Sequence, residues 1–524
     1  MRRPVAQARA GPIAQVWYKC RMEEPTPKAQ TAAAKPSLAH RASRGFAWML
    51  AQTLGSKAAG IVGQIILARL LVPRDYGLVA IAYMVVSLPA VIRQTGIPQI
   101  IIQKGNRFDR WANAAFWMEL ALGFLTMLLM LVAAPIAATA YHAPILWGLV
   151  ALVSTSAVLN ALLSVPVAKL TLDLRFRELA AVGLGYNILA MLISVGCAFV
   201  GLGAYSFVIP LPICLFLRAL VLWKLAPVRV RWSFQFHRWR AMAADSGRLM
   251  VGGLAYLVQI QADNLALSIW HSKATVGNYF FANNLSGQIL QLLALNLGSV
   301  LFPVLSKLQE DLPRQVAAYL RAARALALAG IPLCVAEAVL ARPAVMVFFG
   351  ARWIAAIAIL RVAALAAAVN LAGSSSENLF QSQGRFHAAM LWATISAGTF
   401  TALVFLGSIF GGPVLVAAGS LACAAVVAPA RTWSAIRVGG GRFRDVARVF
   451  LPPLLFSGLA LAPVGLLELF VPWFDSHHVA TLAIGAVTAP LIYLPLVWHF
   501  CPGDVDELLS HAGPLGRRLR RKQG

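Results

Sequence analysis

Long apolar segments recur along almost the whole chain, and they constrain its fold more than any other feature of the sequence. About 20 consecutive apolar residues are enough to cross a bilayer. Cutting the chain at its charged, proline, glycine and asparagine clusters leaves fourteen segments near or above that length. Their limits are 44–70, 76–103, 112–138, 144–169, 177–201, 204–226, 243–270, 276–305, 314–341, 353–381, 385–410, 412–437, 447–472 and 478–500. The sequence therefore predicts an all-α polytopic membrane protein with about fourteen transmembrane helices.

The composition supports this fold class. Of the 524 residues, 60% are hydrophobic and only 12% are charged, whereas an ordinary soluble protein has about 25% charged residues. No segment between the tails is polar enough to form a separate soluble domain.

The distribution of basic residues predicts an orientation. With the N-terminus inside, 35 of the 45 lysines and arginines fall in the two tails and the cytoplasmic connections, and five fall in outer connections. This is the excess expected on the cytoplasmic side, so the net charge of +26 reflects a membrane surface and gives no support for nucleic acid binding. We expect a bacterial inner-membrane protein with both termini in the cytoplasm.

The tails differ from the rest. Residues 1–43 are rich in Ala, Pro and Lys and lack the apolar core of a signal peptide. We expect a disordered basic cytoplasmic tail, or a start assigned too early, with the true start nearer Met22. Residues 501–524 form a second basic cytoplasmic tail.

Two pairs of matching segments indicate an internal repeat. Gly77 and Gly277 both precede an aromatic-bearing helix at an outer turn, and "LRFREL" (174–179) is echoed by "GRFHAA" (384–389). Six spans per half give both halves the same orientation, which is a transporter architecture. We predict an N-lobe at 44–240, a C-lobe at 241–445 and two additional helices at 446–500.

Two cations fall inside predicted spans. Lys57 lies at the middle of the first span and Arg93 close to the centre of the second. A charge at the bilayer centre costs about 2.5–3.5 kcal/mol on insertion scales, and neither span has a carboxylate in its core. Three explanations for Lys57 stay open: snorkelling, a salt bridge with Asp263, or a ligand that carries negative charge.

Polar stripes mark four of the predicted spans. Helical spacing places them on one face of each helix, and we expect these faces to line one cavity. Fixed cations and amide donors suit an anionic head group that bears hydroxyls. The candidate substrate-binding residues are Lys57, Arg93, Gln64, Gln94, Gln259, Asn284, Gln288 and Gln291.

Three further charged residues are candidates for ion coupling or gating: Asp263, Arg361 and Glu337. Their alternatives are structural: Asp263 pairs with Arg361, and Arg342 satisfies Glu337. The Asn and Gln residues of span eight have an alternative too, as hydrogen-bonding contacts between helices.

The sequence gives little support for an enzyme. The six cysteines are widely separated, with no CxxC pair, and the outer connections are short. There is no P-loop. We therefore expect no catalytic residues, no metal and no cofactor.

Four stretches resemble a known family. "RASRGFAWMLAQTLGSKAAGIVGQIILARLLVPRDYGLVAIAYMVV" (41–86) is similar to the opening of the Wzx-type polysaccharide exporters, or lipopolysaccharide and O-antigen flippases. These belong to the multidrug/oligosaccharidyl-lipid/polysaccharide exporter superfamily. "LDLRFRELA" (172–180), "QADNLALSIWHSKATVGNYFFANNLS" (261–286) and "VLFPVLSKLQED" (300–311) fit the same pattern. The resemblance implies two six-helix lobes in a V, with spans one, two, seven and eight around the cavity.

The resemblance also implies a substrate, an undecaprenyl-pyrophosphate-linked oligosaccharide moved to the outer face for O-antigen, capsule or exopolysaccharide synthesis. Lys57 and Arg93 then fit as pyrophosphate ligands, and the amides as sugar contacts. We expect a functional monomer in contact with membrane lipid, and polymerase or export machinery as a candidate partner. The alternatives are a cation-coupled drug antiporter of the same superfamily and a membrane glycosyltransferase or ligase.

Overall fold

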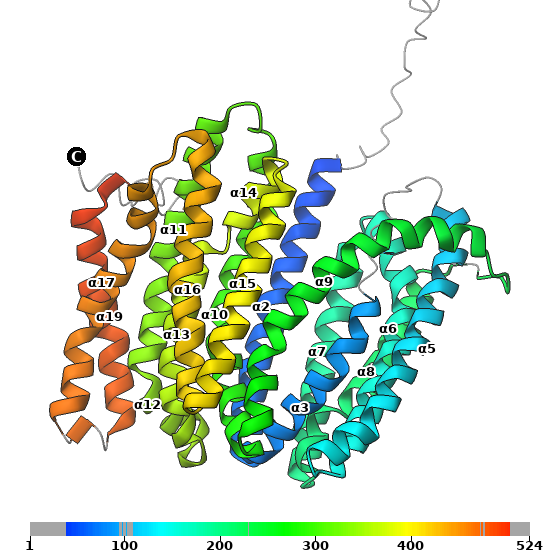
Figure 1. The fold of residues 1–524 in the computed structure, drawn as a ribbon, viewed down its shortest axis with the longest axis horizontal. Helices are drawn as coiled ribbons and strands as arrows, with labels where there is room; N and C mark the ends of the chain where they lie inside the picture. The colour runs from blue at the N-terminus through cyan, green and yellow to red at the C-terminus, as the bar shows by residue number, and fades with distance from the viewer. Residues whose placement is uncertain are drawn as a thin grey trace, which may run out of the picture.

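The computed structural model describes residues 38–93, 97, 101, 108–228, 230–471, 473–474 and 477–503, and the regular elements in this part of the chain are all helical. Fourteen of the helices are long (Figure 1). They are α2 (Leu38–Leu70), α3 (Pro73–Ala90), α5 (Phe108–Ala140), α6 (Ile145–Leu172), α7 (Phe176–Phe199), α8 (Pro210–Leu225), α9 (Phe236–Trp270), α10 (Lys273–Ser306), α11 (Leu312–Val339), α13 (Ile354–Gly373), α15 (Phe386–Phe410), α16 (Pro413–Ile436), α17 (Phe443–Phe470) and α19 (His478–Phe500).

Eleven helical segments of the described residues are long and apolar enough to cross a membrane. The three other predicted spans correspond to α2, α9 and α10, the helices in which the sequence places most of the polar stripes. The all-α membrane fold is confirmed, while the count of fourteen spans stays a prediction. Helix α2 begins at Leu38, so residues 38–43 of the predicted N-terminal tail are helical. Residues 1–37 and 504–524 lie outside the described part, and the disorder proposed for them stays a prediction.

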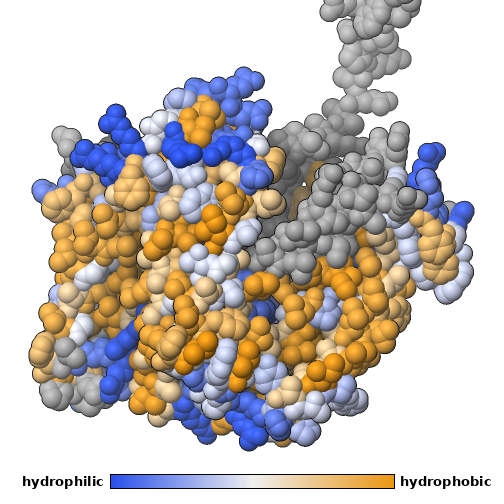
Figure 2. Space-filling view, in the orientation of Figure 1, coloured by the Kyte–Doolittle hydropathy of each residue, from blue (hydrophilic) through white to orange (hydrophobic). Residues whose placement is uncertain are grey.

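The outer surface matches a bilayer. Figure 2 shows hydrophobic side chains across the middle of the molecule and hydrophilic ones gathered toward both ends. Large apolar side chains are exposed on these helices, including Leu128, Ile136, Leu192 and Leu455. A soluble protein rarely exposes so large a contiguous apolar surface, so this surface fits contact with lipid.

Two predicted spans are broken. The second, expected to run unbroken to residue 103, ends as α-helix at Ala90, and a 3-10 turn follows at Val91–Arg93. Pro89 supplies no N–H to the helix, which favours such an end. The tenth span is also divided, into α13 and a short α14 (Ser376–Ser382). Arg93 therefore lies in a 3-10 turn inside the predicted second span, because Ile97 and Ile101 beyond it are helical again.

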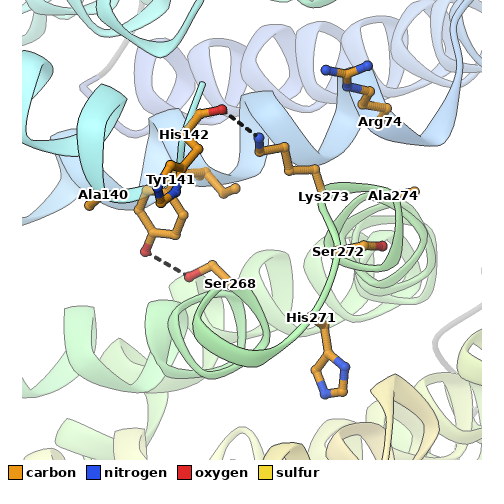
Figure 3. A pocket seen from close by; sticks show the side chains of 10 residues that line it. Arg74, Ala140, Tyr141, His142, Ser268, His271, Ser272, Lys273 and Ala274 are labelled. Atoms are coloured by element: carbon orange, nitrogen blue, oxygen red, sulfur yellow. Dashed lines mark hydrogen bonds between the residues drawn. The ribbon is translucent and has the colours of Figure 1, made fainter. Parts of the chain in front are cut away.

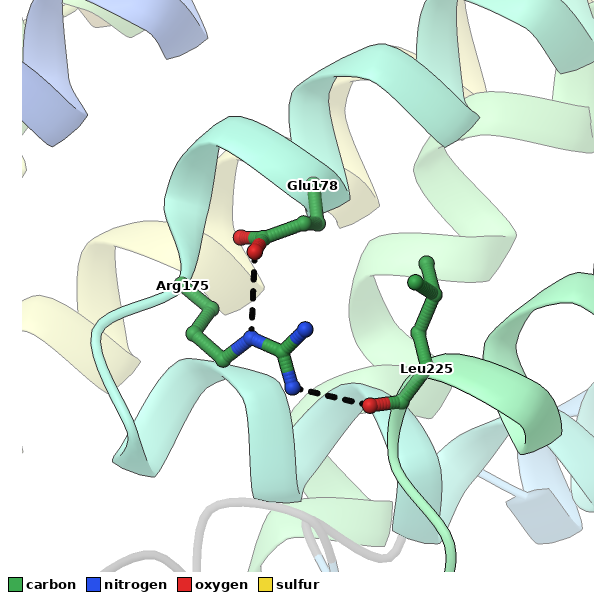
Figure 4. Close-up of polar contacts among 3 residues, drawn as sticks. All are labelled: Arg175, Glu178 and Leu225. Carbon is green, nitrogen blue, oxygen red and sulfur yellow. Dashed lines mark hydrogen bonds and ion pairs between the residues drawn. The ribbon is translucent and has the colours of Figure 1, made fainter.

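The repeat seen in the sequence is a structural repeat. Arg175 and Arg385 precede α7 and α15 with almost the same backbone conformation, at φ −86°, ψ 52° and φ −87°, ψ 53°. Nη1 of Arg175 donates to the Leu225 carbonyl at 2.8 Å (Figure 4), and Nη1 of Arg385 donates to the Ser434 carbonyl at 3.1 Å. In each half, one arginine thus ties the start of the fifth helix to the end of the sixth.

The residues before these arginines share a left-handed turn. Leu174 has φ +56° and Gly384 has φ +69°. A non-glycine residue is strained in this region, so the N-terminal half retains the turn at a local cost that the second half avoids with glycine. The matching geometry at Leu174 and Gly384 supports a common origin for the two halves.

The two halves meet at Gly77 of α3 and Gly277 of α10. A Cβ atom added to Gly77 would lie 1.7 Å from the Lys273 carbonyl oxygen, and one added to Gly277 would lie 1.7 Å from the Pro73 carbonyl oxygen. The contact is reciprocal, as a two-fold relation between the halves requires. Only glycine permits this approach of the backbones. We call this end of the molecule, with the turns at 71–72, 141–144 and 271–272, the Gly77 end.

Aromatic rings pack around this contact. Tyr76 lies 4.7 Å from Trp353 between ring centroids, and Phe281 stacks on Trp353 at 4.1 Å. The indole Nε1 of Trp353 donates to the Ala68 carbonyl at 2.9 Å. These fully or almost fully buried rings bring residues of both halves into one core at the Gly77 end.

We predict that Gly77→Ala and Gly277→Ala each lower the thermal stability of the purified protein. The added methyl group must push two backbones apart, and overpacking of this kind typically costs about 1–3 kcal/mol. Thermal unfolding in detergent measures the effect.

Gly60→Ala in α2 is the matched control, because no atom lies within 4 Å of a Cβ added there. Alanine also has the higher helix propensity, so the control should unfold at the same temperature as the wild type or above it. Equal melting of Gly77→Ala and Gly60→Ala would contradict the reciprocal contact.

Candidate functional site

Lys57 is held by glutamines of the other half of the chain. Its ammonium donates to Oε1 of Gln288 at 3.0 Å and to Oε1 of Gln291 at 2.8 Å. Nε2 of Gln288 lies 3.5 Å from Oε1 of Gln64. The structure thus brings together four of the predicted substrate-binding residues, from α2 and α10.

The ammonium of Lys57 is only partly buried, and its two recorded bonds go to neutral amides. The ion pairs within the described residues do not include it, so a salt bridge with Asp263 is not formed. Snorkelling is not observed, because the ammonium bonds two glutamines of α10. The positive charge of Lys57 therefore remains available to a negatively charged group.

Arg93 does not join this cluster. It is attracted electrostatically by Glu119 of α5, a side chain that is only 3% exposed. Nε of Arg93 is buried without a hydrogen-bond partner in the described part of the chain. Arg93 thus has a carboxylate neighbour that Lys57 lacks.

The remaining predicted polar contacts lie elsewhere. Nε2 of Gln259 donates to Oγ of Ser396 on α15 at 3.0 Å, and Nδ2 of Asn284 donates to the Phe280 carbonyl of its own helix at 2.9 Å. Asn284 is exposed. Gln94 lies outside the described residues. Gln259 accordingly serves as a contact between helices.

Asp263 is almost completely buried, with 3% of its surface exposed. Its carboxylate accepts the backbone N–H of Asn264 at 2.7 Å, Nδ2 of Asn283 at 3.4 Å and the hydroxyl of Tyr279. Three donors on two adjacent helices, α9 and α10, therefore satisfy this carboxylate locally.

Arg361 pairs with Glu468 of α17 at 3.6 Å. The predicted alternative, a pair between Asp263 and Arg361, is therefore wrong. The pair instead ties α17, one of the two additional helices, to α13 of the C-terminal half. The sequence does not predict this pair, because Arg361 and Glu468 lie in different predicted spans and helical periodicity relates only residues of the same span.

Among the described residues, Glu337 of α11 is the acidic residue with an unsatisfied buried atom. Its Oε2 is buried and has no hydrogen-bond partner among the described residues. A hydrogen bond from Arg342 to this oxygen is thus not formed.

A second polar location lies at the Gly77 end. A pocket of about 500 Å³ is lined by Arg74, Tyr141, His142, Ser268 and Lys273, among others (Figure 3). The Tyr141 hydroxyl and Oγ of Ser268 are 2.9 Å apart, and the Lys273 ammonium donates to the His142 carbonyl at 3.3 Å. These bonds cross from the α5–α6 turn to the α9–α10 hairpin, so they join the two halves.

Glu119, like Glu468, is not among the residues predicted from the sequence. It is the single acidic residue of the predicted span 112–138, and an ionisable residue within a span is a functional candidate by default. The polar stripes occur on spans one, two, seven and eight, whereas this carboxylate belongs to the third span.

Comparisons with known proteins agree with this fold. The family described as "Polysaccharide biosynthesis protein" matches residues 66–358. The succinoglycan biosynthesis transport protein ExoT of Rhizobium meliloti (strain 1021) is 25% identical over 456 residues, which are 86% of this chain and 92% of that protein.

Solved structures share the architecture. The lipid II flippase MurJ in an inward closed conformation superimposes with a TM-score of 0.69 at 15% identity, over 87% of this chain and 99% of MurJ. An inward-facing multidrug transporter of the MATE family gives 0.58 at 14% identity, over 75% of this chain and 95% of that one. A transporter of the same MOP superfamily from Pyrococcus furiosus, described by a binding pocket of reverse polarity, gives 0.52 at 14% identity over 80% and 99%.

We predict opposite stability effects for the two charged sites. Glu119→Leu should destabilise the protein, because it removes the carboxylate that attracts the partly buried Arg93 and leaves that charge less compensated. Lys57→Met should leave stability unchanged or raise it, because it removes a partly buried charge whose partners are neutral. Thermal unfolding of both variants in one detergent makes the comparison, and equal losses would contradict the assignment.

Proposed function

Because this chain belongs to the family of polysaccharide biosynthesis proteins, we propose that it is a flippase for a lipid-linked oligosaccharide. The substrate is an oligosaccharide on undecaprenyl pyrophosphate, and it moves from the cytoplasmic to the outer face of the inner membrane. The product serves the synthesis of a surface polysaccharide.

One observation carries this proposal. Lys57 keeps a positive charge at the middle of a membrane helix while its recorded partners are two amide oxygens. Such a cation suits an anionic head group, and the amides beside it can exchange their hydrogen bonds for those of sugar hydroxyls. Pyrophosphate linked to an oligosaccharide presents both kinds of group.

The mechanism that we propose is alternating access between two lobes, 44–240 and 241–445. The Gly77 end is the outer face in this scheme, because the basic connections lie at the opposite end. The reciprocal contact of Gly77 with Gly277, and the bonds across the pocket of Figure 3, close the outer side and must separate for release. The chain acts as a monomer, with polymerase or export machinery as a candidate partner.

A cation-coupled drug antiporter is the alternative from the same superfamily. It requires a carboxylate beside its substrate that is free to bind the transported cation. Asp263 of α9 already has three donors, and Glu337 lies on α11, outside the helices of the Lys57 cluster. The basic charge of Lys57 favours an anionic substrate over this alternative.

Complementation tests the proposal. In cells that lack their own polysaccharide flippase, wild type should restore surface polymer, whereas Lys57→Ala should lose most of it and accumulate the lipid-linked precursor at the cytoplasmic face. Lys57→Arg should retain function because it keeps the charge. Protein abundance is measured by blot in each strain.

Gln259→Ala is the matched control, since its amide bonds Ser396 outside the Lys57 cluster. It should complement almost fully. If Lys57→Ala also complements fully at normal abundance, the charge has a structural role only and the proposal is wrong.

Ion coupling is proposed at Glu337, with Asp263 and Arg361 in structural roles. The unsatisfied Oε2 of Glu337 can accept a proton, whereas Arg361 is already paired with Glu468. We predict that transport by Glu337→Gln in reconstituted vesicles loses its response to an imposed proton gradient, and that Arg361→Gln keeps it. An unchanged response in Glu337→Gln would contradict the assignment.

A further inference from the structure

The linker between α8 and α9 is fixed to the N-terminal half by its backbone. Oδ1 of Asn113 accepts the N–H of Arg231 at 2.8 Å, and Nδ2 of Asn113 donates to the carbonyl and hydroxyl oxygens of Ser233 at 3.0 and 3.1 Å. The indole Nε1 of Trp117 donates to the Arg231 carbonyl at 2.9 Å. One asparagine and one tryptophan of α5 thus hold this linker in place.

The fixed backbone presents aromatic rings to the outside. Trp232 and Phe234 are alternate residues near the end of the linker, and Phe236 is the first residue of α9. Their exposed fractions are 81%, 44% and 66%. Trp232 packs against Trp117 at 4.6 Å between centroids, and Phe234 stacks on Phe236 at 6.1 Å. We call Trp232, Phe234 and Phe236 the aromatic face.

Positive charge surrounds the aromatic face. Arg231, Arg110 and Lys224 are exposed, and the guanidinium of Arg238 lies over the ring of Trp111 at 5.6 Å. Asp109 is the acidic residue next to this group in sequence. The surroundings therefore carry a net positive charge beside rings that stay 44% to 81% exposed.

We propose that the aromatic face and its arginines bind anionic phospholipid head groups of the adjacent leaflet. Aromatic side chains concentrate at the boundary between membrane and water, and each basic residue near an anionic surface adds about fivefold to the affinity. In Figure 1 the segment that leads into α9 forms the right-hand edge of the molecule, where lipid can reach it. A protein partner would bury the same rings, but the flanking charge favours an acidic lipid surface.

The position of the linker gives this binding a mechanical consequence. Trp239, in the first turn of α9, donates its Nε1 to the Ala114 carbonyl of α5 at 2.9 Å. Further along α9, Gln259 bonds Ser396 of α15. Helix α9 is thus fixed to both halves, and lipid at the linker holds its N-terminal end to the membrane surface.

Photocrosslinking in defined bilayers tests the proposal. The full chain carries p-benzoylphenylalanine in place of Trp232, in bilayers of phosphatidylcholine with a minor fraction of phosphatidylglycerol. Mass spectrometry then measures the lipid adducts. We expect phosphatidylglycerol to be about threefold to fivefold enriched over its share of the bilayer. The same label in place of Phe199, which is 70% exposed at the Gly77 end of α7, should show no enrichment.

The double variant Arg231→Gln, Lys224→Gln tests whether the enrichment of phosphatidylglycerol depends on the positive charge or only on the closeness of residue 232 to lipid. Only the backbone of Arg231 bonds Asn113 and Trp117, so the linker should keep its fold while the enrichment falls toward one. Unchanged lipid adducts at position 199 show that the variant is intact. Equal enrichment at positions 232 and 199, or adducts with a protein in intact cells in place of lipid, would overturn the proposal. The assay uses no transport substrate, so its outcome is independent of the proposed flippase activity.

Discussion

The backbone contact between Gly77 of α3 and Gly277 of α10 is the constraint on which the rest of this structure depends, and it places the Lys57 ammonium opposite two glutamine oxygens. An ammonium in a membrane helix needs oxygen partners, and those of Lys57 lie 231 and 234 residues further along the chain. Helices α2 and α10 must therefore face each other across the two halves. The glycine contact provides that arrangement. It brings the first turns of α3 and α10 into direct backbone contact, and α2 directly precedes α3 in the chain.

The two halves share their supporting contacts and differ in their polar chemistry. Equivalent arginines, Arg175 and Arg385, close the same helix pair in each half, and the glycine contact is reciprocal. The stripe of α2 contributes a cation, whereas the stripe of α10 contributes amides. A symmetric frame thus holds an asymmetric site, with the charge on one side and neutral hydrogen-bonding groups on the other.

The helices, the repeat and half of the candidate substrate-binding site could be predicted from the sequence. Apolar length determines where helices lie, and helical spacing placed Lys57, Gln64, Gln288 and Gln291 on faces that do meet. The same spacing could not predict that Gln259 turns toward α15, because the neighbours of a buried helix are determined by packing. Glu119 and Glu468 were not predicted for a similar reason. Glu119 lies near Arg93 and Glu468 pairs with Arg361, but in each case the two residues are on different helices, which helical periodicity does not relate. The break after Ala90 comes from Pro89, whose effect depends on how neighbouring helices accommodate the lost hydrogen bond.

A direct binding measurement on the purified protein tests the central claim, that Lys57 binds an anionic lipid head group. Native mass spectrometry would compare undecaprenyl pyrophosphate with uncharged undecaprenol, for wild type and for Lys57→Gln. The account predicts that wild type prefers the pyrophosphate and that Lys57→Gln loses most of this preference while binding undecaprenol as before. Equal preference for the pyrophosphate in both proteins would contradict the claim and leave Lys57 with only the structural role of hydrogen-bonding α2 to α10.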